Sequence, residues 1–469
     1  MRRRILTFAA GVLALASAPA AAERDVERAT LARLGGLHDA ETLAVDTFPV
    51  GPTRSTTIRF RRVPIYSADA HIYAETPAGR VEVPRSDLIF LRGYADDGSA
   101  RVALTLSPQF AVLHGGGQGV EGSFALHATA HGTATTLVAS RLESGFPPGF
   151  DFKFRCGNET EQVVNASQAA QPSLAVQIAR ATQAAAATTA AGNKLRFAVV
   201  AIDTDSKFMA VFSNNTANAT DYIATVFNTM NLMYERDLQV QLQVGTTILR
   251  TNVATDPYAA FTVGATTAQL DTFASNWKTN EGSVVRSFAA LLSGAIASTE
   301  FGCSASGVAW IKQYCQKGTT QGTDTVGSYS INQVCTNLSI DQSDQLNARL
   351  IGHEIGHNFG AWHTHCTDAG NASAPVGTNT IDTCFTGESY VIGGMVKPCY
   401  AGAVSCPAAG AGTVMSYCNQ TGCPANTQDL LQFSPIQVTD ATNGLLTYIN
   451  AAPAGCLNTT DDIFFSLFE

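Results

Sequence analysis

Residues 353–363 read HEIGHNFGAWH and bring three histidines and one glutamate together within eleven positions. His353 and His357 are four residues apart. On an α-helix their side chains would therefore lie one above the other on one face and could grip a single metal ion. Glu354 would project beside that pair, where it is poorly placed to be a third ligand.

The residues around this motif predict a buried helix that ends just after it. Ser343 or Asp344 could cap its start. Two lines of apolar residues at helical spacing would bury it: Leu346, Leu350, Ile351, Ile355 and Phe359. Gly360 can adopt the left-handed conformation that ends a helix, and the chain can then turn back to bring His363 to the same ion.

Three neutral imidazoles with one open position form the ligand set of a catalytic zinc. We therefore expect one Zn²⁺ per chain, held by His353, His357 and His363. Zinc lowers the pKa of water to about 7, and Glu354 could take the proton and deliver it to a leaving amine. The alternative is that these histidines sit on a core helix and are satisfied by backbone carbonyls. The glycine and the third histidine argue against chance.

Composition excludes some other classes of protein. The chain has 469 residues, a formal net charge of −9 and a pI of about 5.5, so a nucleic-acid partner is not expected. Residues 1–22 combine three arginines, an apolar run and small residues, which is typical of a secretory signal peptide. That run is too short to span a membrane comfortably, and no later stretch is long enough. We expect a secreted monomer without stable membrane insertion.

The cysteines fit an oxidising compartment. Ten of the eleven follow residue 300 and could close five disulfides, whereas Cys156 stands alone. The pairing cannot be derived, because ten cysteines allow hundreds of combinations. Cys156 is therefore either a functional thiol, a free cysteine or half of an intermolecular bond.

Three further segments follow the signal peptide. Residues 23–158 contain alternating apolar runs between glycines and prolines, which predict a mostly β domain. Residues 159–193 are rich in Ala, Thr and Gln, and we read them as a protease-accessible linker, although an Ala-rich helix is an alternative. From residue 194 to 458, strand and helix patterns alternate and predict a sheet flanked by helices. The apolar tail 459–469 is unexplained.

The extended histidine motif resembles that of the metzincin zinc endopeptidases, and its surroundings resemble the reprolysin (adamalysin-like) branch, particularly its secreted bacterial members. The segment GTVMSYC, with Met415, is similar to the family's Met-turn beneath the metal. The resemblance covers residues 194–458. It implies an α/β (α+β) catalytic domain with a mixed, mainly parallel sheet and a zinc cleft, preceded by a mostly β propeptide domain.

The resemblance also implies roles for individual residues. GVAWIKQYC is similar to the edge strand that binds substrate, which would involve Gly307, Val308, Ala309 and Trp310. It suggests a disulfide between Cys315 and Cys456. Tyr417 occupies the place of a tyrosine that stabilises the tetrahedral intermediate in related families, with simple packing as the alternative. Ca²⁺ binding near the last cysteine is possible in such proteins, but the sequence shows no clear acidic cluster.

Two departures from the family pattern affect the site. Many reprolysins have aspartate directly after the third histidine, whereas this chain has Thr364 followed by His365, which we expect at the surface or behind a ligand. The long segment between His363 and Met415 carries four cysteines and is similar to a disulfide-pinned insertion.

Cys156, in the segment KFRCGNE, resembles the cysteine switch of metzincin propeptides, although the usual preceding proline is absent. A thiolate there would ligate zinc in place of water until the linker is cleaved. The sequence thus predicts a secreted zinc metalloendopeptidase, made as a zymogen, that acts on proteins or peptides. The alternatives are a secreted zinc-containing adhesion or binding protein and a zinc hydrolase with a non-peptide substrate.

Overall fold

The structure is a computed structural model. It describes residues 23–38, 40–141, 151–157, 195–299, 302–335, 340–392, 395–408, 410–420, 423 and 431–459. The expected signal peptide, the whole linker region 159–193 and the apolar tail beyond residue 459 lie outside these residues.

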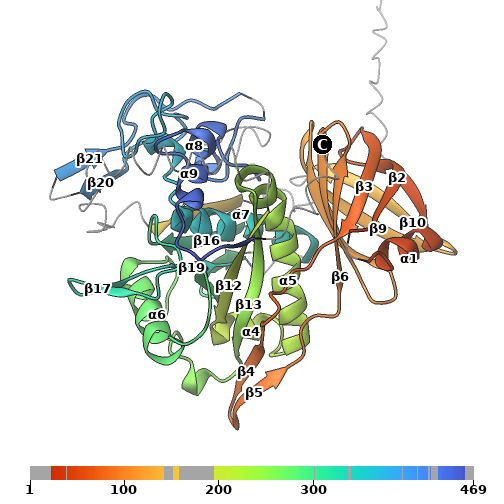
Figure 1. Ribbon diagram of the computed structural model, residues 1–469, viewed down its shortest axis with the longest axis horizontal. Helices are drawn as coiled ribbons and strands as arrows, with labels where there is room; N and C mark the ends of the chain where they lie inside the picture. The colour runs from red at the N-terminus through yellow and green to blue at the C-terminus, as the bar shows by residue number, and fades with distance from the viewer. Residues whose placement is uncertain are drawn as a thin grey trace, which may run out of the picture.

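The N-terminal part of the chain forms an antiparallel sheet packed on its own apolar core (Figure 1). Its strand order is β1-β10-β9-β8-β7-β6-β3-β2. The elements are β1 (Glu23–Glu27), α1 (Arg28–Gly35), β2 (Thr42–Pro49), β3 (Ser55–Arg62), β6 (Ile89–Ala95), β7 (Ala100–Leu106), β8 (Val112–Gly119), β9 (Gly122–His131) and β10 (Ala134–Arg141). The predominance of strands agrees with the alternating apolar pattern of this region.

A second, larger sheet runs through the rest of the molecule in the order β11-β16-β19-β14-β12-β13-β4-β5. Its strands are β4 (Ile72–Thr76), β5 (Gly79–Val83), β11 (Asp151–Cys156), β12 (Arg196–Thr204), β13 (Val240–Arg250), β14 (Phe288–Ser293), β16 (Gly302–Ala309) and β19 (Tyr329–Gln333). Two short strands also pair with strands of this sheet: β15 (Ala297–Thr299) pairs with β16, and β22 (Asn458–Thr459) pairs with β12. Strands β13, β12, β14 and β19 are mutually parallel and β16 is antiparallel to β19, so the sheet is mixed and mainly parallel.

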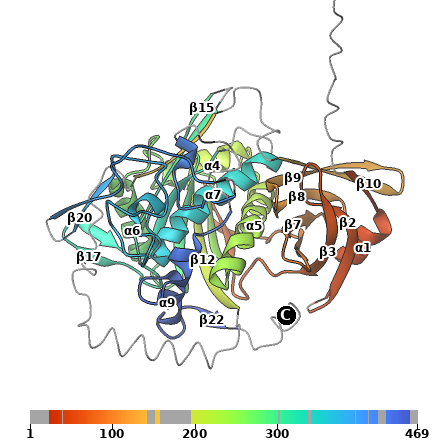
Figure 2. The same ribbon diagram turned by 90° about the horizontal axis from the view of Figure 1, so that it is seen from above.

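Helices cover both faces of this sheet (Figure 2). α5 (Thr216–Met233) and α7 (Ile340–Phe359) lie side by side on one face, where Val200 and Ile202 of β12 point. α6 (Thr267–Asn280) packs on the other face against Ala201. The remaining short elements are α4 (Ser206–Val211), the π-turn η3 (Tyr234–Leu238), η4 (Val253–Thr255), β17 (Thr319–Gln321), β18 (Asp324–Val326), η5 (Thr364–Cys366), β20 (Ser389–Ile392), β21 (Met395–Pro398), η6 (Cys418–Gln420), α8 (Pro435–Thr439) and α9 (Leu445–Asn450).

The two parts of the chain share one sheet. The hairpin β4–β5 comes from the N-terminal part of the chain but lies outside its sheet. Its strand β4 pairs in parallel with β13 at one edge of the larger sheet, with Ile72 opposite Thr247. At the other edge β11 pairs in parallel with β16. Residues between β3 and the end of β4, such as Val63, Ile65 and Ile72, belong to the same apolar core as α5 and α7. The N-terminal residues therefore extend the larger sheet at both ends.

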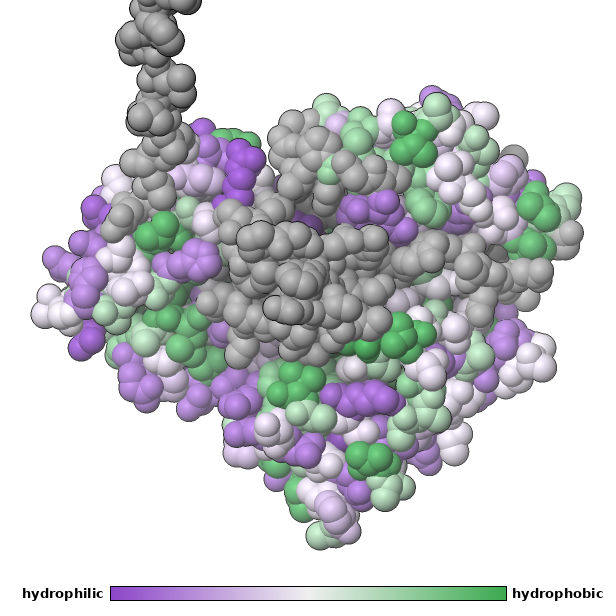
Figure 3. All heavy atoms as spheres, turned by 180° about the vertical axis from the view of Figure 1, so that it is seen from behind, coloured by the Kyte–Doolittle hydropathy of each residue, from purple (hydrophilic) through white to green (hydrophobic). Residues whose placement is uncertain are grey.

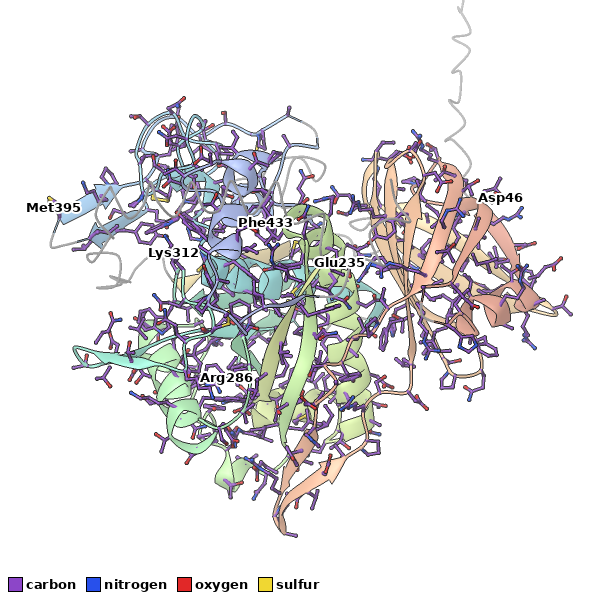
Figure 4. All side chains as sticks on the ribbon, in the orientation of Figure 1. Asp46, Glu235, Arg286, Lys312, Met395 and Phe433 are labelled. Carbon is purple, nitrogen blue, oxygen red and sulfur yellow. A yellow bond between two sulfur atoms is a disulfide. The ribbon has the colours of Figure 1, made fainter. Side chains whose placement is uncertain are left out.

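A buried ionic contact joins the N-terminal sheet to the end of α5. Glu235 of η3 lies between the two parts of the molecule (Figure 4). Its carboxylate binds the guanidinium groups of Arg92 and Arg61, each at 3.3 Å, and accepts a hydrogen bond from Tyr94 Oη at 2.8 Å. Burial opposes ionisation, but the two arginines hold the pKa of Glu235 below its ordinary value. The interface therefore contains a compensated charge rather than an isolated one.

Some local predictions need correction. α7 begins at Ile340, so Ser343 and Asp344 lie inside the helix and neither is its N-cap. The alternation of apolar and polar residues over 238–244 predicts a strand with one buried face, but β13 is largely buried on both faces, because helices pack on both sides of the sheet. Leu238 belongs to the π-turn rather than to this strand.

Disulfides tie the C-terminal segments together. Among the residues that the structure describes, the pairs are Cys315–Cys456, Cys366–Cys399, Cys384–Cys418 and Cys406–Cys423, and Cys335 is also disulfide-bonded. Polar and apolar residues are interspersed on the face in Figure 3, outside its grey atoms. Among the described residues, no helix combines the length and apolar character needed to cross a membrane.

Candidate metal centre

Helix α7 carries the first half of the site into the core of the protein. His353, Glu354 and His357 all have no exposed surface. Two glycines allow close packing around them. A Cβ at Gly352 would come within 2.0 Å of Met233 Cε, and one at Gly356 would lie 2.9 Å from Met415 Sδ.

The turn after α7 brings in the third histidine. Gly360 has φ +111°, a conformation that suits glycine, and its N–H donates to His357 O at 2.9 Å. The chain reverses, and His363 Nε2 comes to lie 3.1 Å from Nε2 of both His353 and His357. The remaining pair, His353 and His357, is 3.0 Å apart. The structure thus brings together the three histidines that the sequence predicts as one cluster.

The other ring nitrogen of each histidine has its own acceptor. His353 Nδ1 lies 2.7 Å from Val414 O, and His357 Nδ1 lies 2.8 Å from Ala361 O. Carbonyl oxygens only accept, so both Nδ1 atoms must carry the proton. Burial, together with the neighbouring histidines, lowers the pKa of His357 to about 3 and that of His353 well below its ordinary value. Both rings are therefore neutral, and their Nε2 lone pairs face one another.

Imidazole nitrogens that converge in this way can bind a single cation. Ligand nitrogens around a tetrahedral zinc, with Zn–N of about 2.0–2.1 Å, lie about 3.3 Å apart, close to the separations observed. A donor set of three imidazoles suits zinc and leaves one position open. The residues present therefore fit the metal that the motif predicts.

A carboxylate holds the third histidine. Oε1 and Oε2 of Glu388 lie 2.8 Å and 2.9 Å from His363 Nδ1, and Glu388 also accepts a hydrogen bond from His365 Nε2. Burial alone would raise the pKa of Glu388, but the two histidines hold it well below its usual range. His365 is fully buried, which excludes the surface alternative for it.

Met415 is fully buried, and its sulfur lies close to Gly356 of α7. Its carbonyl accepts a hydrogen bond from the backbone N–H of Thr364 at 3.0 Å. The Thr364 hydroxyl also donates to the carboxylate of Asp382. Many reprolysins have an aspartate directly after the third histidine. This chain has Thr364 there, and the carboxylate of Asp382 contacts that residue instead.

Tyr417 lies against the histidine cluster. Its ring centroid is 4.5 Å from that of His363, and its ring is nearly parallel to that of His353. Its hydroxyl accepts a hydrogen bond from the backbone N–H of Cys156 at 3.1 Å. Tyr417 therefore packs on the cluster and also presents a polar group toward the segment that covers it.

Cys156 covers the cluster. Its Sγ lies 3.5 Å from His357 Nε2 and 3.6 Å from Glu354 Oε2. The sulfur and the three histidine ligand atoms all lie within 4.8 Å of one another. Cys156 is a buried thiol rather than part of a disulfide. The four groups could thus surround a single ion.

Strand β16 passes beside Glu354. A Cβ on Gly307 would lie 2.3 Å from Glu354 Oε1, so the glycine makes room for the carboxylate. Trp310 follows the strand, and its carbonyl accepts from Asn358 Nδ2 at 2.8 Å, which fixes α7 against it. In the full chain β16 is not an open edge, because β11 pairs with it and places Cys156 opposite Gly307.

The sequence did not predict the contact between Glu388 and His363. Glu388 is the one glutamate between His363 and Met415, but nothing in its spacing marks it as close to a histidine. The structure also pairs Cys315 with Cys456, as the family resemblance suggests. Within the described residues no group of three oxygen-only ligands that could hold Ca²⁺ is found, and two of the three candidate metal groups contain disulfide cysteines.

Comparisons with known proteins concern mainly the C-terminal half. The family described as metallo-peptidase family M12 (Reprolysin_5) matches residues 193–434, which is more than half of the 469 residues. No curated protein sequence matches the chain.

Two solved structures show weaker likenesses. Metalloproteinase-II from Bacteroides fragilis has a TM-score of 0.34 and 10% identity, and the match covers 72% of this chain and 86% of that one. A chaperone-substrate complex has a TM-score of 0.27 and 12% identity, over 55% of this chain and 34% of that one. Neither likeness is close enough to carry an argument.

Proposed function

This chain belongs to family M12 of the metallopeptidases, and from that premise we propose that it is a secreted zinc endopeptidase made as a latent precursor. The observation that carries the proposal is the convergence of three imidazole Nε2 atoms, 3.0–3.1 Å apart, beside a buried glutamate. One zinc ion per chain would bind to His353, His357 and His363.

The residues around the metal have distinct roles in this proposal. A bound zinc lowers the pKa of water to about 7 and polarises the scissile carbonyl. Glu354 accepts the proton of the attacking water and delivers it to the leaving amine. Tyr417 donates its hydroxyl proton in a hydrogen bond to the oxyanion that develops on the carbonyl. Met415 packs beneath the ligands.

Substrate binding uses β16. An extended peptide would pair with the main chain of Gly307–Ala309 and reach past Trp310, because backbone hydrogen bonds hold a strand at a sheet edge. β11 has to leave this edge first. The pairing of β11 with β16 supports a substrate site there, since it shows that an extended segment fits beside Glu354.

Latency follows from the same arrangement. Residues 23–158 act as a propeptide whose Cys156 would ligate the zinc in place of water, and cleavage within 159–193 frees β11 and Cys156 to leave the site. Its contacts with His357 and Glu354 support this role. In our proposal residues 1–22 direct export, residues 194–458 form the catalytic domain of a monomer, and the disulfides fit an extracellular destination.

The test uses linker-cleaved protein on casein, with and without a zinc chelator, beside Glu354→Gln. We expect cleavage that the chelator abolishes and zinc restores. Glu354→Gln should keep zinc but lose about 10²–10⁴-fold in rate. Zinc binding without hydrolysis would favour an adhesion or binding protein. Ester hydrolysis without proteolysis would favour a non-peptide hydrolase.

A further inference from the structure

Glu388 supports the histidine cluster from a separate segment of the chain. It directly precedes β20, and its side chain, like that of His363, has no exposed surface. Both carboxylate oxygens lie within 2.9 Å of His363 Nδ1. The same carboxylate accepts from His365, so one acidic group fixes two imidazoles.

The three proposed ligands are held in different ways. His353 and His357 donate to main-chain carbonyls, which are neutral acceptors. His363 donates to a carboxylate, which forms a stronger hydrogen bond and makes the ring a more basic ligand. His363 is also the ligand outside the helix, so its orientation depends more on a partner than on α7.

The segment that carries Glu388 is tied to the site at several points. Cys384, four residues before it, is bonded to Cys418, the residue after Tyr417. The backbone carbonyl of Glu388 accepts from Cys399 N at 3.0 Å, and Cys399 is bonded to Cys366. These links run to the segments that carry His363 and Tyr417, so the loop cannot shift independently of the site.

We propose that Glu388 is a positioning residue for the metal centre: it orients His363 and sets the affinity with which the chain holds zinc. The disulfide-pinned segment between His363 and Met415 supplies this carboxylate. The inference rests on the proposed zinc site, which it deepens.

The experiment measures zinc binding to the full chain by competition with a chelating dye, and records the visible spectrum after substitution with Co²⁺. Glu388→Gln keeps the size and one acceptor oxygen but removes the charge. Glu388→Asp keeps the charge on a shorter side chain. Glu82→Gln is the matched control, because Glu82 of β5 pairs with His71 Nδ1 at 2.7 Å, and both side chains are exposed and belong to no part of the cluster.

We expect Glu388→Gln to weaken zinc binding by about 10- to 100-fold and to shift the Co²⁺ bands, with Glu388→Asp intermediate and Glu82→Gln unchanged. The thermal melting temperature of the metal-free proteins separates positioning from folding. A folded Glu388→Gln protein with wild-type zinc affinity and Co²⁺ spectrum overturns the inference. If Glu388→Gln does not fold, Glu388→Asp with wild-type affinity overturns it. Wild-type protein that binds no zinc would instead overturn the proposed function itself.

Discussion

The Sγ atom of Cys156 lies 3.5 Å from Nε2 of His357, at the open side of the histidine cluster. The same residue donates its backbone N–H to the hydroxyl of Tyr417. One residue of the N-terminal segment therefore engages both the position where a fourth ligand would bind and the group proposed to stabilise the oxyanion. β11 continues this contact along β16.

Cys156→Ala should raise the activity of the uncleaved precursor, because the open position then becomes available to water. Activation should be partial, since β11 would still cover the strand that binds substrate. Casein turnover of the precursor, with autolysis blocked, measures this effect. Treatment of the wild-type precursor with a mercurial should act in the same direction. Full activity of the wild-type precursor with its thiol intact would contradict the switch.

Gly307→Ala should abolish most activity while zinc content stays normal. The added Cβ would lie 2.3–2.5 Å from three atoms of the buried Glu354 side chain, which has to move. A displaced general base should cost about 10²-fold or more in rate. Gly370→Ala is the control, because that exposed position offers a nearest contact of 3.1 Å, to Asp368. Equal activities of the two variants would show that Glu354 is not the base or can relocate.

Tyr417→Phe separates oxyanion stabilisation from packing. The ring keeps its contacts with His353 and His363, whereas the hydroxyl is lost. If the hydroxyl meets the oxyanion, kcat should fall by about 10²–10³-fold with little change in KM, because the contact forms only in the transition state. Tyr400→Phe, which removes an exposed hydroxyl bonded to Ala403 O, is the control. An unchanged kcat would assign Tyr417 to packing alone.

The sequence predicted the parts of the site that depend on local spacing. His353 and His357 meet because four residues make about one helical turn, and Gly360 turns the chain because it accepts a positive φ. Glu388 could not be found in this way. Its contact with His363 depends on the path of a loop fixed by disulfides whose pairing has many alternatives.

The limits of the fold prediction have the same origin. The alternation of apolar residues correctly indicated strands in the first third of the chain. It could not indicate that β4 leaves the N-terminal sheet to pair with β13, because strand pairing across more than 150 residues has no local signature. The N-cap of α7 was misplaced for a different reason: serine and aspartate are also tolerated inside a helix.

The metal-free protein should lose stability as the pH falls from about 6.5 toward about 3. The pKa of His357 is lowered to about 3, chiefly by burial, and that of His353 is lowered as well. Between those pH values the unfolded chain binds protons that the folded chain does not, so acid favours unfolding. Each histidine contributes up to about 1.4 kcal/mol per pH unit. Denaturant titrations at pH 7 and 5 measure the slope. His357→Gln should reduce it, and an identical slope would contradict neutral burial of this ring.

Cleavage of the linker alone should leave the N-terminal fragment bound to the catalytic segment. Its β4–β5 hairpin pairs with β13, and Ile72 and Ala74 of β4 are buried there. Removing this hairpin would expose apolar core and unpaired main chain along β13, both of which favour aggregation. Arg92 adds a buried ion pair with Glu235. We therefore expect the two fragments to elute together in gel filtration.

Ile72→Asp tests this retention, because a carboxylate at a fully enclosed position of the added strand opposes its docking. The cleaved variant should separate into fragments, and its catalytic segment should melt at a lower temperature than the wild-type complex. Val81→Asp is the matched control, since Val81 lies on the neighbouring strand β5 and is 44% exposed. Its fragments should stay together. If cleaved wild-type fragments separate without denaturant, and residues 194–458 alone melt at the temperature of the complex, the hairpin is dispensable. The sheet of the catalytic segment would then end at β13.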